Sequence, residues 1–169
     1  MTTTLLIGCQ GHSNLLAFNL APEELGNSRV LQMQTQISYG DQSYAMENIV
    51  DISKEKIQII GTAGGIRIFT IIYNGNEIIN GPGIGMPFYF PINSITEDNL
   101  FVLASPATIQ SHLTTNYTLE SNTNEKKLLQ SGKVVMRMER RPDGKGNSII
   151  TLYRTSPEYK LNIVMSEVK

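Results

Sequence analysis

Few side chains in this sequence have the type and spacing that chemistry requires. Cys9 is the only cysteine, so it cannot form a disulfide within the chain. His12 and His112 are far apart in the sequence and have no neighbouring metal ligands. Glu97 and Asp98 stand at the start of a predicted helix, where carboxylates stabilise the helix dipole. We therefore expect a protein that is not an enzyme, with no catalytic residue, no metal site and no cofactor.

A second chemistry for Cys9 is the attachment of a lipid. The segment Leu6-Ile7-Gly8-Cys9 resembles the lipobox of bacterial lipoproteins, with a bulky apolar residue three positions before the cysteine and a small residue directly before it. The basic region and the apolar run of about 7–15 residues that a signal peptide needs are missing or cut short. We therefore interpret residues 1–9 as the remnant of a lipoprotein signal peptide, with Met1 internal to a longer precursor or an artificial start. The alternative is a cytosolic protein in which Cys9 is incidental.

Length and composition describe one weakly charged domain. The chain has 169 residues, of which 40% are apolar and 17% charged, and its formal net charge is −1. A disordered chain would carry more charge, and a nucleic-acid-binding surface would need a basic excess. No apolar run approaches the ~20 residues of a membrane-spanning helix. The glycine-rich stretches 61–65 and 81–85 lack the spacing of a phosphate-binding loop that leads into a helix. The composition therefore favours a folded domain with no nucleic-acid partner.

Alternation of apolar and polar residues predicts strands over most of the chain. From residue 30 to 39, glutamines and a serine alternate with larger, mostly apolar side chains, which is the period of a half-buried strand. The capping-box spacing of Ser94 and Glu97 and the pair Ser105-Pro106 predict two short helices at 94–103 and 106–113. Further strands are expected at 44–52, 56–60, 66–73, 77–80, 117–120, 126–130, 133–140, 148–154 and 159–165. The fold class is mainly β (α+β), with a large, curved antiparallel sheet and one helical insertion.

The apolar residues of such a sheet have two interpretations. They fill an ordinary core, or a curved sheet with few helices leaves a cavity for acyl chains. The apolar segment 81–91, rich in glycine and proline, must cover something or be covered. The basic residues near a predicted hairpin end are interpreted as a solvated turn, with weak contact to anionic head groups as the alternative. These residues are Arg137, Arg140, Arg141 and Lys145.

Several segments together resemble a known family. They are Leu20-Ala-Pro-Glu-Glu-Leu-Gly26, Val30-Leu-Gln-Met-Gln34, the stretch 57–73 followed by Asn74-Gly75, and the proline-bearing helical region. Over about residues 20–166 the chain is similar to a family of small bacterial lipoproteins of unknown function, which is distantly similar to the LolA/LolB outer-membrane lipoprotein localisation factors. The resemblance implies an unclosed β-barrel around a short helical lid, with a hydrophobic cavity that receives acyl chains by binding and transfer, without covalent chemistry.

The resemblance and the residues lead to one functional prediction. We expect a monomeric, lipid-anchored protein on the periplasmic face of the bacterial outer membrane, which binds a lipid or acylated cargo and takes part in its transfer to that membrane. Cys9 is the predicted lipid attachment site, residues 10–19 a tether and residues 20–169 the β domain. The predicted cavity residues are Met46, Ile57, Ile59, Ile66, Ile68, Phe88, Phe90 and Met136.

Two points are left open by the sequence. The turn 62–65 lacks the bulky apolar residue that the membrane-anchored localisation factor projects from the corresponding loop, so membrane insertion by that device is not expected. The concave face of the sheet is not specified either, because a slip of one residue moves every side chain to the other face. The alternative function is a structural or assembly lipoprotein whose core is filled and which holds no lipid.

Overall fold

The computed structural model describes residues 16–85 and 91–168, and within them ten strands form one sheet. Each strand pairs antiparallel with its neighbours in the order β5-β4-β3-β2-β1-β10-β9-β8-β7-β6. The elements are η1 (Pro22–Leu25), β1 (Arg29–Tyr39), β2 (Gln42–Ile52), β3 (Ile57–Ala63), β4 (Ile66–Tyr73), β5 (Ile78–Asn80), α1 (Ile92–Leu103), α2 (Pro106–His112), β6 (Tyr117–Ser121), β7 (Glu125–Gln130), β8 (Lys133–Pro142), β9 (Ser148–Thr155) and β10 (Glu158–Glu167).

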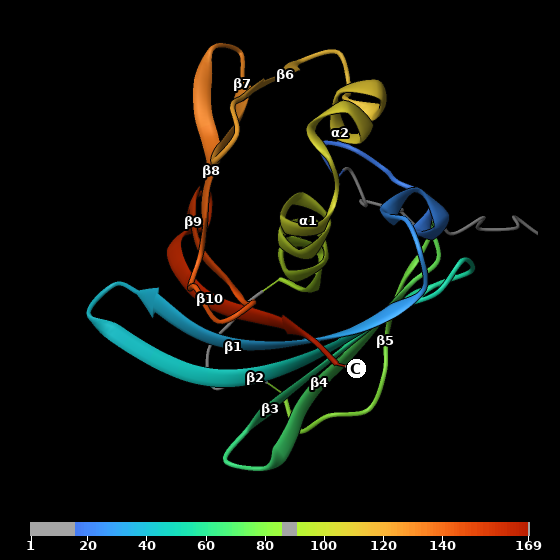
Figure 1. Cartoon of the computed structure of the whole chain (residues 1–169), viewed down its shortest axis with the longest axis vertical. Coiled ribbons are helices and arrows are strands. Elements are labelled where there is room, and N and C mark those ends of the chain that lie inside the picture. Colours follow the sequence, from blue (N-terminus) through green and yellow to red (C-terminus); the bar gives the residue numbers. More distant parts are fainter. Residues whose placement is uncertain (1–15, 86–90, 169) are drawn as a thin grey trace, which may run out of the picture.

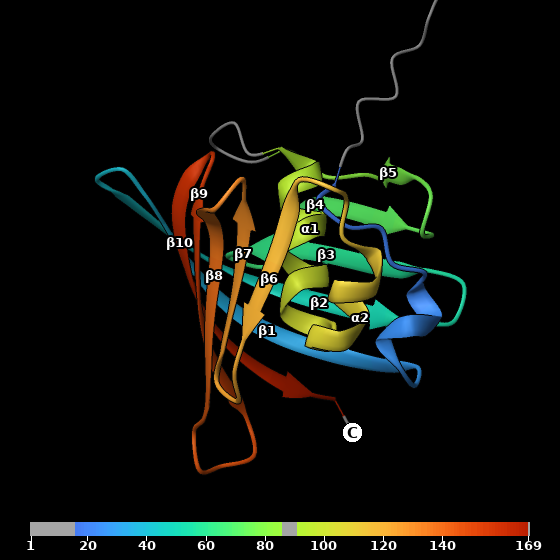
Figure 2. The ribbon, with the colours of Figure 1, turned by 90° about the horizontal axis from the view of Figure 1, so that it is seen from above.

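The sheet is curved and unclosed. Strands β5 and β6 stand at the two ends of the order, and the sheet bends around α1 without these ends pairing (Figure 1). The second view shows α1 and α2 on the same side of the strands (Figure 2). The predicted fold class, a curved antiparallel sheet with a short helical lid, is therefore confirmed.

Side-chain alternation decides which face of each strand is concave. In the central strand β1 the buried positions are Leu31, Met33, Thr35 and Ile37, whereas Gln34 and Gln36 are exposed. Residues that pair across neighbouring strands point to the same face of the sheet. Thr35 pairs with Met46 on β2 and with Ile163 on β10, so these three side chains lie on the same face. Apolar residues at every second position thus line the side on which α1 lies.

Helix α1 differs from its prediction at the first turn. It begins at Ile92 with Pro91 as N-cap, and Ser94 is a buried residue inside the helix. The predicted capping box at Ser94 is wrong, because the Glu97 side chain bonds to residues outside the helix instead. Helix α2 begins as predicted, since the Ser105 hydroxyl accepts a hydrogen bond of 3.1 Å from the Thr108 backbone N–H.

The domain begins earlier than the sequence indicates. The predicted tether included residues 16–19, yet Leu16, Ala17 and Phe18 are buried in the core. Phe18 forms a β-bridge with Leu113 and its ring centroid lies 6.2 Å from that of Phe101. The tether prediction is therefore wrong for residues 16–18, because their side chains belong to the hydrophobic core, whereas Asn19 is exposed. Cys9 lies outside the described residues. Within the described ranges, none of the helices has the length and apolar character needed to cross a membrane.

Candidate functional site

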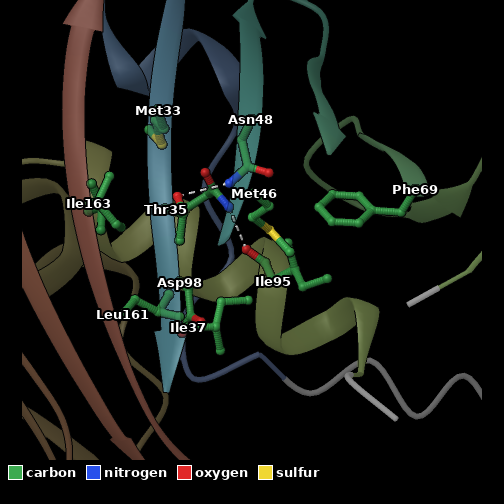
Figure 3. A pocket seen from close by; sticks show the side chains of 12 residues that line it. Met33, Thr35, Ile37, Met46, Asn48, Phe69, Ile95, Asp98, Leu161 and Ile163 are labelled. Carbon is green, nitrogen blue, oxygen red and sulfur yellow. Dashed lines mark hydrogen bonds between the residues drawn. The ribbon is translucent and has the colours of Figure 1, made fainter. Parts of the chain in front are cut away.

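A small cavity lies between α1 and the sheet (Figure 3). Its volume is about 30 Å³, which is room for no more than about two water molecules. Strands β1, β2, β4 and β10 form one wall and α1 the other. The apolar lining residues are Met33, Ile37, Met46, Phe69, Ile95, Val102, Leu161 and Ile163, and the polar ones are Thr35, Asn48, Asp98 and Asn99.

The shape of this cavity depends on a glycine of β3. A Cβ placed on Gly61 would lie 2.3 Å from Cε1 of Phe69, its cross-strand partner. Only a residue without a side chain lets the Phe69 ring lie down on the neighbouring strand. Because Gly61 also pairs with Asn48, the ring is brought to the cavity wall next to that amide.

Asn48 and Thr35 form a polar pair in this mostly apolar wall. The Asn48 Nδ2 donates to the Thr35 Oγ1 at 3.1 Å, and both residues are more than nine-tenths buried. The Oδ1 of Asn48 is buried and has no hydrogen-bond partner. An unsatisfied buried acceptor costs about 1–3 kcal/mol. The amide of Asn48 therefore lowers the stability of the folded protein.

Four side chains form a buried ionic cluster beside the cavity. The Arg154 Nη2 lies 2.5 Å from Oε2 of Glu97, and its Nε lies 3.0 Å from Oδ1 of Asp98. The Tyr159 hydroxyl donates to the second oxygen of Asp98, and Glu97 Oε1 accepts from the Ala17 backbone N–H at 2.6 Å. This cluster joins the middle of α1 to β9, β10 and the N-terminal segment. The interpretation of Glu97 and Asp98 as helix-dipole residues is therefore wrong.

Burial changes the proton affinity of two members of this cluster. Burial raises the pKa of Asp98 to about 6, although the charge of Arg154 and the bond from Tyr159 act in the opposite direction. Burial, followed by the charge of Asp98, raises the pKa of the Tyr159 hydroxyl far above its ordinary value. Tyr159 is therefore a permanent donor to Asp98.

Two cations hold the C-terminal end of α1. The Lys126 Nζ donates to the carbonyls of Phe101 and, at 2.9 Å, Ala104, and the Arg140 Nη2 donates to the carbonyl of Val102 at 2.8 Å. Cations are favourable there because the last carbonyls of a helix carry partial negative charge. The interpretation of Arg140 as part of a solvated hairpin end is wrong, since it is half-buried against α1. Burial, and then the charge of Arg140, lowers the pKa of Lys126 to about 7.

These contacts make the surroundings of α1 asymmetric. The side chains that hold it with charge-assisted bonds come from β7, β8, β9 and β10. On the side of the cavity, which it shares with β1, β2, β4 and β10, the helix contributes Ile95, Asp98, Asn99 and Val102. The helix is therefore anchored on one half of the sheet and meets the other half through largely apolar contacts.

The structure separates the predicted cavity residues into three groups. Met46 lines the cavity, whereas Ile57, Ile59 and Met136 are buried on the same concave face outside its lining. Ile66 is 57% exposed at the start of β4 and Ile68 is buried at an irregular position of the β3–β4 pairing, and neither of them lines the cavity. Phe88 and Phe90 lie outside the described residues.

Sequence reasoning missed Asn48, Lys126 and Arg154. A signal for them exists: each occupies the period-two position at which its strand otherwise carries apolar residues, as Arg154 follows Ile150 and Leu152. A polar residue in an apolar row is buried with a partner or serves a site. Among the described residues, no three His, Cys, Asp or Glu side chains gather as metal ligands.

Comparison with known proteins yields a matching family model and matches among solved structures, one of which is described here. The model of the family described as "Protein of unknown function (DUF3261)" matches residues 30–167. A crystal structure of a LolA superfamily protein from Nitrosomonas europaea is 12% identical, with a TM-score of 0.46, over 88% of this chain and 90% of that chain. The search of curated proteins finds no match.

Proposed function

The chain belongs to the DUF3261 family of proteins of unknown function, and we propose that it binds the acyl chain of a lipid or acylated cargo between α1 and strands β1, β2 and β4. One observation carries the proposal. A largely apolar cavity lies between α1 and a wall that includes these strands, whereas the bonds from basic side chains to the helix come from β7, β8 and β9. An acyl chain needs apolar walls. The concave face of the sheet offers such walls at this cavity, and in this proposal the acyl chain displaces the adjacent helix α1.

A cavity of about 30 Å³ is too small for an acyl chain, so binding requires its walls to move apart. Met33 and Met46 suit such a change, because methionine is flexible and polarisable and repacks around ligands of different shape. The anchors at Lys126, Arg140 and Arg154 keep α1 attached to the far half of the sheet while its apolar side separates from the near half. In this proposal α1 acts as a lid that is attached on one side.

The same small volume favours one alternative, which is a structural or assembly protein with a filled core. The two functions differ in whether the purified protein carries lipid. A carrier yields acyl species when the native protein is extracted with organic solvent and analysed by mass spectrometry. A structural protein yields none and binds no added fatty acid.

Substitution of a cavity methionine tests the site itself. We expect Met46→Gln to weaken the binding of a saturated long-chain fatty acid at least about tenfold, because an unpaired amide in an apolar wall costs roughly 1–3 kcal/mol. Displacement of a fluorescent fatty-acid probe measures the affinity. The matched control is Met138→Gln, since Met138 is buried on the concave face but does not line the cavity. Equal loss of affinity in both variants would place the ligand elsewhere.

Lipid attachment and location form a separate part of the proposal. We propose that Cys9 carries a diacylglyceryl anchor on the periplasmic face of the outer membrane, which would place the domain where it can transfer its cargo. Mass spectrometry of the N-terminal peptide of the protein isolated from its native membranes is the test. We expect a peptide that begins at a lipidated Cys9. An unmodified peptide that continues through Gly8 and Cys9 would contradict the anchor without affecting the cavity.

A further inference from the structure

The unpartnered amide oxygen of Asn48 carries information about the ligand. Asn48 is 7% exposed and stands in the middle of β2, where its Oδ1 has no partner and its Nδ2 is held by Thr35. The close view shows the amide beside the cavity, with Met46 and Phe69 to one side of it and Met33 on the adjacent strand (Figure 3). Met33, Met46 and Phe69 have no polar hydrogen to donate to this buried acceptor.

We propose that the ligand carries a neutral hydrogen-bonding group, a hydroxyl or an amide N–H, along its apolar chain, and that Asn48 binds this group. The inference rests on the proposed function and specifies its ligand class. A plain hydrocarbon chain would fill the cavity but leave the Oδ1 unpaired. A chain with a donor at this position satisfies both the apolar wall and the buried acceptor.

The position of Asn48 indicates a group within the chain rather than a charged head group. The amide is flanked by Met33 across the β1–β2 pair and by Phe69 folded over Gly61, so a group that reaches it has apolar surface on two sides. The described residues that line the cavity include no Lys, Arg or His, and an ionised group that is buried without a charged partner is very costly. An ionised carboxylate or phosphate is therefore excluded at this point, whereas a hydroxyl is not.

A hydroxyl also fits the polar pair as a unit. It donates and accepts, so it can donate to the Asn48 Oδ1 while it accepts from the Thr35 hydroxyl, whose proton is not used in the bond from Nδ2. A net hydrogen bond of this kind changes affinity by a factor of roughly ten. The site should therefore prefer a hydroxylated chain over its unsubstituted counterpart without requiring the hydroxyl.

Paired neutral probes test this preference. We expect the wild-type protein to bind at least one monohydroxylated isomer of methyl hexadecanoate about tenfold more tightly than methyl hexadecanoate itself, as measured by displacement of a fluorescent probe. Equal affinity for the saturated ester and every hydroxylated isomer would overturn the inference and leave the proposed function intact. Failure of the protein to bind any of these esters would overturn both.

A double variant assigns the preference to the polar pair. Thr35→Val with Asn48→Leu replaces both partners by apolar groups, so no partner is left unpaired. We expect the ratio of this variant's affinities for the hydroxylated ester and for methyl hexadecanoate to fall to about one, and we expect the variant to unfold at the same or a higher temperature.

The chain offers a matched control on the other side of the sheet. Thr151 and Asn162 form a similar cross-strand pair, 3.4 Å apart, on the outer face of β9 and β10. The variant Thr151→Val with Asn162→Leu should keep the tenfold preference. If the preference persists in the Thr35/Asn48 variant, or disappears equally in the control, the assignment to Asn48 is wrong.

Discussion

Replacing Arg154 with methionine is expected to lower the free energy of unfolding by about 3–5 kcal/mol. The guanidinium is the cation that holds both Glu97 and Asp98, and the side chains of these three residues are only 10%, 11% and 4% exposed. Without it, two carboxyl groups remain buried next to each other with no positive partner. Urea denaturation at neutral pH measures the loss, and it should exceed that of any exposed arginine.

Arg137→Met is the control for charge removal in general. Arg137 pairs with Glu125 and Glu139 at 2.6 and 2.5 Å, but its side chain is 45% exposed, and exposed pairs contribute at most about 1 kcal/mol. Neutralising the whole cluster with Arg154→Met, Glu97→Gln and Asp98→Asn should restore much of the loss, because no unpaired charge remains. A loss for Arg154→Met no greater than that for Arg137→Met would show that the cluster does not anchor α1.

Stability should also depend on pH through Asp98. Burial raises its pKa from 3.8 to about 6 in the folded protein, so the folded state binds the proton more tightly than the unfolded state does. The resulting stabilisation is complete below about pH 4 and is lost as the pH rises through 6. Relative to Asp98→Asn, which does not titrate, the wild-type protein should lose about 2 kcal/mol between pH 4 and pH 7.5.

The measurement is the difference between the two unfolding free energies at each pH, which cancels the titration of all other groups. Asp143→Asn provides the opposite case. Hydrogen bonds from the backbone N–H of Lys145 and the side chain of Asn147 hold the pKa of Asp143 below its usual value, so its contribution grows as the pH rises at the acidic end of the range. A difference for Asp98 that stays constant from pH 4 to 7.5 would mean that Arg154 keeps its carboxyl ionised throughout.

Much of the fold could be predicted from local pattern. The alternation in residues 30–39 and the Ser105-Pro106 helix start each depend on neighbours in the sequence, and the structure places a strand and a helix there. Membership in a family of unknown function is confirmed by the family model, whereas the lipid anchor and the cargo stay predictions. The start of α1 was misplaced, because Glu97 is used by Arg154 and Ala17, which are distant in the sequence.

The candidate site was predicted less well, and the reason lies in the pairing of distant strands. The lining residues Met46, Phe69 and Ile163 come from three strands, and no spacing in the sequence indicates that they meet. Ile66 and Ile68 looked equivalent to the other isoleucines, yet the irregular pairing at Gly61/Thr62 shifts the register where β4 begins. An irregularity in the pairing of two strands changes the direction in which the following side chains point. Neither the composition of the chain nor the period of its apolar residues reveals such an irregularity.

The sequence by itself determined most elements of this protein: which segments are strands or helices, and along which strands apolar and polar residues alternate. Those properties follow from period-two alternation and turn chemistry, which act over a few residues. The tertiary structure alone decided which face is concave, how α1 is anchored and where the unpartnered amide of Asn48 lies. These depend on the curvature of the whole sheet around α1, which brings Arg154 to Glu97 and Lys126 to the carbonyls at the C-terminal end of the helix across long sequence distances. Burial then determines how much each polar group affects stability. An amide or a charge is well solvated in water, whereas inside an apolar wall it costs free energy unless it has a partner.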